Sequence, residues 1–258
     1  MNKKIRFMIT LVFLCSLMVF WPGTTLAQPG SEPEAAARQA GAAETLKDVF
    51  PDDNFRYCVK DIVLGDESIP DSALFETYRD KIENELYLNA RSAKIKSIAG
   101  IERFKALREL DVSFSYLTSL DISGNSELLS LQCQGNALTS LDISKNAKLY
   151  NLHCNDNRLT SIDLTKNPNL ITVILDENAL TELDVSENLE LNYLGVENTK
   201  LTKLDIANNT KLIYLNCKNV PLNNLYINHL KDLESLYFGH EALKGVDISN
   251  NRKLKRFS

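Results

Sequence analysis

The sequence contains few of the residues from which catalytic centres are usually built. Only three of its 258 residues are histidine, namely His153, His229 and His240. No nucleophile elbow, phosphate-binding loop or zinc-binding helix motif occurs in the chain. We therefore expect neither enzyme activity nor a cofactor. A catalytic pair of carboxylates remains an open alternative, because such a pair leaves no motif in a sequence.

Clusters of positive charge are also lacking. The formal net charge is -5 at pH 7, and no block of Lys or Arg forms a cationic stripe. Nucleic acids and anionic membranes are bound through such stripes. We therefore expect neither as a partner.

A long apolar run occurs only at the start of the chain, over residues 7–21, after three positive residues and before small residues that end at Ala27. This pattern is typical of a secretory signal peptide, here residues 1–27. We expect a secreted protein that begins at Gln28 with a net charge of -8, because Lys3, Lys4 and Arg6 are removed. A retained anchor is one alternative, although the run is shorter than the ~18 to 20 residues that span a bilayer. Lipid attachment at Cys15 is another.

The absence of a second spanning run or a C-terminal wall-sorting motif predicts no membrane insertion after cleavage, and leaves cell-surface association open. Residues 28–45 are rich in Pro, Gly, Ser, Glu and Ala, which predicts a disordered linker.

Residues 46–85 predict a helical N-terminal cap, or alternatively a small independent domain. One helix would start at residues 50–53 and a second at Pro70. The second helix would place Leu74, Tyr78, Ile82 and Leu86 on one face.

From there to the end, leucine recurs every 21 residues without insertion. Such a period is the signature of a solenoid, whose repeats bury their apolar faces only by stacking on one another. Apolar residues return 3, 5, 10, 13 and 15 positions after each such leucine, and positions 3 and 5 share one strand face. Each repeat therefore predicts one short parallel strand. The recurring leucines are Leu107, Leu128, Leu149, Leu170, Leu191, Leu212, Leu233 and Leu254.

The repeat, L-x-x-L-x-[CV]-x-x-N-x-L-T-x-L-D-[IV]-S-x-N, resembles the leucine-rich repeat, and its cysteine position resembles the internalin J branch of the bacterial internalins. The resemblance covers residues 86–258, about eight repeats with the last incomplete, and the first turn is one residue longer. It implies an α/β solenoid, a horseshoe with a parallel concave β-sheet, exported by a bacterium. The chain ends within its eighth strand, so we also expect an open edge over residues 254–257 through which two chains could pair.

Three of the cysteines that follow the predicted signal peptide, Cys133, Cys154 and Cys217, occupy position 5 of their repeats, and only Cys58 does not. In an exported protein cysteines usually form disulfides. However, Cys133 and Cys154 would lie on adjacent parallel strands with parallel side chains, which suits a disulfide poorly. Val112, Leu175, Val196 and Phe238 fill the same position elsewhere. We therefore expect buried, apolar thiols and no metal site.

The sequence Asp-x-Ser-x-Asn recurs in five repeats, starting at Asp121, Asp142, Asp184 and Asp247, and at Asp163 with Thr for Ser. Its opening resembles a calcium loop, but the Gly and Glu that an EF-hand needs are missing. Asp and Asn also bond to nearby backbone in tight bends. We expect bends and an asparagine stack between coils, with calcium as an alternative.

The outward positions 2, 4, 6 and 7 of each repeat are the candidate binding surface, and positions 2 and 4 supply the residues predicted to bind. Three tyrosines there, together with Ile174, would form an exposed aromatic patch beside Asn151 and Asn216, which suits recognition of a protein or, less well, a glycan. The alternative is that the tyrosines stand there only because tyrosine is favoured in strands. The repeat from Leu212 departs from the pattern at residues 220–221, 226 and 230, which indicates either a second contact surface or sequence drift. The predicted ligand-binding residues are Gln132, Asn151, His153, Ile174, Tyr193, Tyr214, Asn216 and Tyr237.

The sequence thus predicts a secreted protein that binds a partner without covalent chemistry, in contact with a host or at a cell surface. A structural protein that self-associates through its last strand is the alternative. Partner identity depends on a few outward residues that the framework does not determine.

Overall fold

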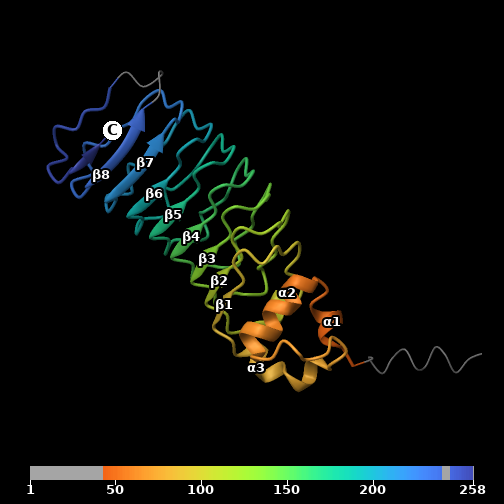
Figure 1. Cartoon of the computed structure of the whole chain (residues 1–258). Helices are drawn as coiled ribbons and strands as arrows, with labels where there is room; N and C mark the ends of the chain where they lie inside the picture. The colour runs from red at the N-terminus through yellow and green to blue at the C-terminus, as the bar shows by residue number, and fades with distance from the viewer. Residues whose placement is uncertain (1–42, 240–244, 258) are drawn as a thin grey trace, which may run out of the picture. The chain divides into compact units, whose positions relative to one another are not determined.

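The computed structural model describes residues 43–239 and 245–257 (Figure 1). The predicted signal peptide and nearly all of the predicted linker lie outside these ranges, and so does His240. Within these ranges, six short helices precede or enter the repeats. They are α1 (Leu46–Val49), α2 (Asp53–Cys58), the π-helix η1 (Val59–Leu64), the 3-10 helix η2 (Phe75–Thr77), α3 (Arg79–Glu83) and the 3-10 helix η3 (Ile101–Arg103). Within the described ranges, no helix is long and apolar enough to cross a membrane.

Two of the helices at the N-terminal end of the sheet, α1 and α2, start at side-chain caps. Thr45 and Asp48 bond to each other's backbone N–H in a capping box at α1, and Asp52 accepts the N–H of Phe55 at α2. Gly65 ends η1 in the left-handed conformation, with φ of 72°. Glu44, within the expected linker, pairs with Arg103 at 2.9 Å. This pair and the Asp52 carboxylate, which accepts the N–H of Lys96, tie the helical segment to the first coil.

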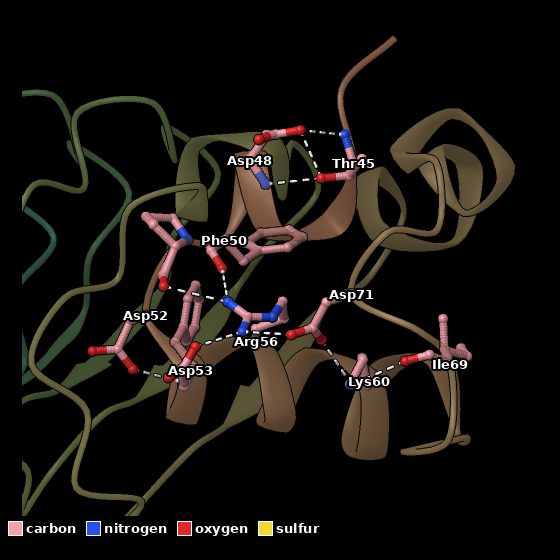
Figure 2. A network of polar contacts seen from close by, with 11 residues as sticks. Thr45, Asp48, Phe50, Asp52, Asp53, Arg56, Lys60, Ile69 and Asp71 are labelled. Carbon is pink, nitrogen blue, oxygen red and sulfur yellow. Dashed lines mark hydrogen bonds and ion pairs between the residues drawn. The ribbon is translucent and has the colours of Figure 1, made fainter.

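A buried arginine holds the helical segment together (Figure 2). The guanidinium of Arg56, 4% exposed, donates to the carbonyl of Phe50 at 2.7 Å and pairs with Asp53 and Asp71 at 2.5 and 2.8 Å. Lys60 pairs with Asp71 at 3.1 Å. The hydrogen bond from Arg56 is the main cause that lowers the pKa of Asp71 to about 2. The network therefore satisfies the one arginine that the fold buries here.

The prediction of the second helix is wrong in the extent of the helix and in the residues that it buries. The chain forms η2 and then α3, separated at Tyr78, instead of one helix from Pro70. Leu74 is 44% exposed, whereas its neighbour Phe75 is fully buried, in contact with the ring of Phe50 at 6.4 Å between centroids. Leu74 pairs with Thr45 in an isolated antiparallel bridge, and this bridge sets the direction of its side chain in place of the helical period.

The repeats form one parallel sheet in which each strand pairs with the next (Figure 1). The first register step is 22 residues, Leu88 to Leu110, and every later step is 21. The predicted period and the longer first turn are therefore confirmed. The strands are β1 (Tyr87–Asn89), β2 (Glu109–Asp111), β3 (Ser130–Gln132), β4 (Asn151–His153), β5 (Thr172–Ile174), β6 (Tyr193–Gly195), β7 (Tyr214–Lys218), β8 (Ser235–Gly239) and β9 (Arg256–Phe257).

The inward positions of the repeat form one continuous core. In the coil that starts at Leu149, the leucine itself and the residues at positions 3, 5, 10, 13 and 15 are all at most 9% exposed. The four cysteines of the described residues are free and buried, as predicted. Cys133 Sγ and Cys154 Sγ lie 3.3 Å apart, and this contact, together with burial, holds the pKa of the Cys133 thiol well above its ordinary value. The thiols therefore pack as apolar side chains.

The predicted bends and asparagine stack are also confirmed. Asp121 accepts the N–H of Ser123, and the equivalent aspartates do the same in later coils. Asn167 Nδ2 donates to the carbonyls of Ile143 and Asn146 in the preceding coil, at 3.0 and 2.9 Å. Each coil is thus bonded to its neighbour through a buried side chain as well as through the sheet. The stack comprises Asn125, Asn146, Asn167, Asn188, Asn209 and Asn251.

Candidate functional site

The outward face of the sheet presents two rows of side chains, because the parallel register places equivalent positions of successive coils side by side. Position 2 runs through Asn151, Thr172, Tyr193 and Tyr214, each paired with the next. The predicted site residues Gln132, His153, Ile174, Asn216 and Tyr237 occupy position 4. All eight therefore share the outward face, but spread over six strands.

Three of them form a compact aromatic group over β6, β7 and β8. The rings of Tyr193 and Tyr214 are stacked, with centroids 3.9 Å apart and planes inclined by 5°. The ring of Tyr237 lies 5.5 Å from Tyr214 and is tilted by 43°. Burial, with the adjacent Tyr193 phenol as a second cause, raises the pKa of Tyr214 far above its ordinary value. The Tyr214 phenol therefore stays protonated and can donate as well as accept hydrogen bonds.

Position 4 of this repeat is a glycine, Gly195, which stands between Ile174 and Asn216 in the sheet. A Cβ atom on Gly195 would lie 2.7 and 2.9 Å from the two carboxylate oxygens of Asp176. The carboxylate of Asp176 thus fills the space where other coils carry a side chain, and a side chain at Gly195 would have to displace it. Asp176 Oδ1 accepts the N–H of Glu197 at 2.5 Å.

Burial raises the pKa of Asp176 to about 6, and the carboxylates of Glu197 and Glu177 add to this effect. Glu197 itself accepts a hydrogen bond from Asn216 Nδ2 at 2.8 Å. Asn216 is only 8% exposed, so its amide supports Glu197 and presents little surface. The expectation of an exposed Asn216 beside the tyrosines is therefore corrected: the outward groups at this place are carboxylates.

The other predicted residues form a separate, polar part of the face. Asn151 Nδ2 donates to the hydroxyl of Ser130 at 2.9 Å. His153 lies between Gln132 and Ile174 in the sheet, and burial lowers its pKa. Gln132 and His153 are three and two strands from Tyr193, so they do not touch the aromatic group.

The sequence analysis placed position 6 on the outward face but named no binding residue there, so Asp176 and Glu197, which stand at that position, were missed. Position 6 continues the same outward face, since Glu197 is two residues after Gly195. The glycine at position 4 of this repeat, Gly195, could have pointed to Asp176. A glycine at an outward strand position often marks a close approach by another group.

A hollow of about 580 Å³ lies elsewhere, on the turns of the irregular repeat. Tyr226, which stands where other coils carry Asp, is 75% exposed and lines it, together with Leu204, Ile206, Ala207 and Asn223. His229 Nε2 lies 3.0 Å from the carbonyl of Ile206, in the place that an asparagine of the stack would fill, since this coil carries Leu230 instead. The inward positions of the repeat stay buried, as predicted.

Comparison with known proteins places the fold. No protein-family model and no curated protein sequence matches the chain. A solved structure of the functional domain of InlJ from Listeria monocytogenes, described as including a cysteine ladder, is 26% identical with a TM-score of 0.51. The match covers 83% of this chain and 56% of that one, so the chain spans little more than half of the InlJ structure.

Two further solved structures agree in fold. Internalin C2 from Listeria monocytogenes is 21% identical, with a TM-score of 0.66 and coverage of 83% of this chain and 96% of that one. A leucine-rich repeat protein from Leptospira interrogans is 24% identical, with a TM-score of 0.63 and coverage of 70% and 50%. Together with the 21-residue repeat and the ordered parallel sheet, these matches show that the chain has the leucine-rich repeat fold and is similar in structure to internalins.

Proposed function

We propose that this protein is exported from a bacterium and binds a partner protein, without chemistry, on the outward face of β6, β7 and β8. In the leucine-rich repeat horseshoe this is the concave face. The observation that carries the proposal is the group formed by Tyr193, Tyr214 and Tyr237. Tyrosine is enriched at the energetic centres of interfaces because it buries a large apolar area and keeps a polar end.

The rigid framework supports this function. The three tyrosines stand on strands whose inward neighbours, Leu194, Leu215 and Leu236, are fully buried. The rings are therefore held in place before any partner arrives, which lowers the entropy cost of binding. A glycan is the less favoured ligand, since stacking covers one face of Tyr193, Tyr214 has an aromatic neighbour on each side, and a sugar ring binds on an aromatic face.

Export is proposed on the pattern of residues 1–27 and on the likeness to internalins. The partner would then be a host protein or a protein of the bacterial surface. The matching experiment immobilises the protein and captures partners from extracts of both origins.

Replacement of all three tyrosines by alanine is expected to abolish the capture, because it removes the aromatic contact area from the centre of the face. The matched control replaces three exposed tyrosines outside this face, Tyr116, Tyr150 and Tyr226, by alanine. It should leave capture unchanged, with both variants equally folded by circular dichroism. Equal capture by the wild type and the first variant would refute the site. Capture that survives protease treatment of the extract would point to a glycan.

A further inference from the structure

We propose that the first three coils carry a second binding surface, on which the guanidinium of Arg91 and the ring of Phe114 take up an acidic segment of a partner protein. A carboxylate of that segment would pair with Arg91, and an apolar side chain beside it would pack on Phe114. The surface lies apart from the three tyrosines, since Phe114 follows β2 and the tyrosines stand on β6, β7 and β8. It therefore does not depend on the proposed function.

Phe114 adopts a backbone conformation that suits few side chains. The chain is left-handed at position 7 of six successive coils, and φ of Phe114 is 53°. The other residues at this position are Gly135, Asp156, Glu177, Asn198 and Asn219. Glycine, asparagine and aspartate enter the left-handed region readily, whereas a bulky aromatic residue is strained there. Phe114 is also 45% exposed, so burial in the core does not account for a phenylalanine at this place.

Three successive coils hold the Phe114 ring in place. A Cβ atom on Gly135, in the next coil, would lie 2.5 Å from Phe114 Cδ1, so the ring lies directly against the backbone there. From the preceding coil, the guanidinium carbon of Arg91 lies over the ring, 4.5 Å from its centroid. The arginine and the ring are thus held together before a partner arrives, which lowers the entropy cost of binding.

The guanidinium of Arg91 keeps its hydrogen-bonding capacity free. Among the described residues it makes no ion pair and donates no hydrogen bond, and only the backbone N–H of Arg91 is bonded, to Asn89 Oδ1 at 3.2 Å. Asp111, on the neighbouring strand, turns its carboxylate to the N–H and the hydroxyl of Ser113. The fork of an arginine matches the two oxygens of a carboxylate, and contact with an aromatic ring limits the directions that the fork can take. Arg91 therefore offers a bidentate site to a carboxylate from outside the chain.

The cations beside this stack are not neutralised by the fold. Arg91, Lys94 and Lys96 lie within six residues, and none of the three makes an ion pair within the described ranges. Residues 112–120 and 133–141, which occupy the equivalent places in the next two coils, contain no Asp or Glu. The two lysines therefore add a positive potential around Arg91, which attracts an acidic partner and orients it.

A protein segment fits this surface better than a nucleic acid or an anionic membrane. The cations are confined to one bend, and Asp52 of the helical segment reaches that bend, where its carboxylate accepts the N–H groups of Lys96 and Ser97. The chain as a whole carries a net charge of -5, which repels an extended polyanion. The exposed ring of Phe114 adds an apolar contact that a phosphate backbone or a lipid headgroup does not match. A carboxylate next to an apolar side chain suits both the charge and the ring.

The test is a titration of the isotope-labelled protein with the peptide acetyl-Glu-Leu-Glu-Leu-Glu-amide, followed by NMR at the backbone amides of Ser92, Phe114 and Gly135. The control ligands are the same peptide with glutamine in place of glutamate, a thymidine oligonucleotide and phosphatidylserine vesicles. We expect saturable shifts at these amides with the acidic peptide, and tighter binding of this peptide than of any control ligand.

The variants separate the fork, the charge and the ring. Arg91→Gln should weaken the binding by about tenfold or more. Arg91→Lys keeps the charge without the fork and should also weaken it. The matched control is Arg252→Gln, which removes one charge from an exposed arginine that makes no ion pair in the described chain and lies in the last coil, and it should leave the binding unchanged. Phe114→Asn should weaken the binding without lowering the melting temperature, because asparagine suits the left-handed backbone.

Equal shifts with the glutamine peptide, equal weakening by Arg252→Gln, or full binding by Arg91→Lys would each overturn the proposed site. Tighter binding of the oligonucleotide or the vesicles would overturn the acidic segment as its ligand. Shifts at Tyr193 and Tyr214 in place of Ser92, Phe114 and Gly135 would show that the peptide binds elsewhere. The variant that lacks the three tyrosines of the sheet should bind the peptide normally, so this outcome and that of the proposed function are separate.

Discussion

Asp176 is placed at a cost to the folded state, because its carboxylate is partly buried beside two other carboxylates. Its pKa is raised to about 6, mainly by burial, against 3.8 for an unperturbed aspartate. The charged and titratable groups that face it are Glu177 and Glu197, which raise the pKa further, and Tyr214. The folded protein therefore binds this proton more tightly than the unfolded chain does.

Because the pKa of Asp176 is higher in the folded protein than in the unfolded chain, the stability of the fold depends on pH. The stabilisation that Asp176 contributes is complete below about pH 4 and is lost as the pH rises through about 6. Asp176→Asn stays neutral and lacks this loss, while the groups that do not interact with Asp176 titrate equally in both proteins. Relative to the variant, we expect the wild type to lose about 1–2 kcal/mol of unfolding free energy between pH 4 and 7, after allowance for solvent screening. Urea unfolding at several pH values measures the difference. A difference that stays constant over this range would show that Asp176 is not desolvated.

Single residues also show where the sequence sufficed and where it did not. The buried thiols of Cys133 and Cys154 could be predicted because the period alone assigns them to inward positions of adjacent strands. The exposure of Leu74 could not be predicted, because a bridge with Thr45, 29 residues away, decides the direction of the Leu74 side chain. Asp176 was missed for a similar reason, since its approach to Gly195 is a contact between two coils.

The asparagine stack is the element that joins successive coils on the side away from the sheet. Each Nδ2 bonds two carbonyls of the preceding coil, and the Oδ1 atoms of the stack accept no hydrogen bond. The contribution of each asparagine to stability therefore comes from its two donor bonds. The irregular coil replaces this residue by Leu230 and recovers one contact through His229.

Asn167→Ala is expected to lower the free energy of unfolding by about 1–3 kcal/mol, because it deletes two buried hydrogen bonds worth about 0.5–1.5 kcal/mol each. Asn169→Ala is the matched control, since this asparagine lies in the same turn, is exposed and makes one bond to the carbonyl of Ala147. It should cost less than about 0.5 kcal/mol. Chemical unfolding of both variants compares them. Equal losses would mean that the stack does not bind the coils together.

The whole molecule illustrates how unevenly a repeat sequence predicts structure and function. The period determined the strand order, the register and the core of residues 86–257, because an uninterrupted interval leaves only one way to stack the coils. Outward residues are not constrained by that interval. Their grouping into an aromatic part over β6–β8 and a polar part over β3 and β4 depends on how side chains of different coils lean toward each other.

The broken repeat offers a competing surface on the same molecule. The hollow beside Tyr226 lies on the turns and not on the sheet, so a partner bound there would leave the three tyrosines of the sheet free. Nothing in its lining selects one kind of ligand, since Lys203, Asp205 and apolar residues all contribute. The two surfaces can be told apart by where a bound partner protects the backbone.

Hydrogen–deuterium exchange of the protein, with and without its captured partner, makes that distinction directly. The account predicts slower exchange in residues 193–197, 214–218 and 235–239, which carry the tyrosines and the carboxylate of Glu197, and no change in residues 202–207 and 223–229 around the hollow. Protection confined to residues 202–207 and 223–229 would contradict it and would move the binding site to the turns.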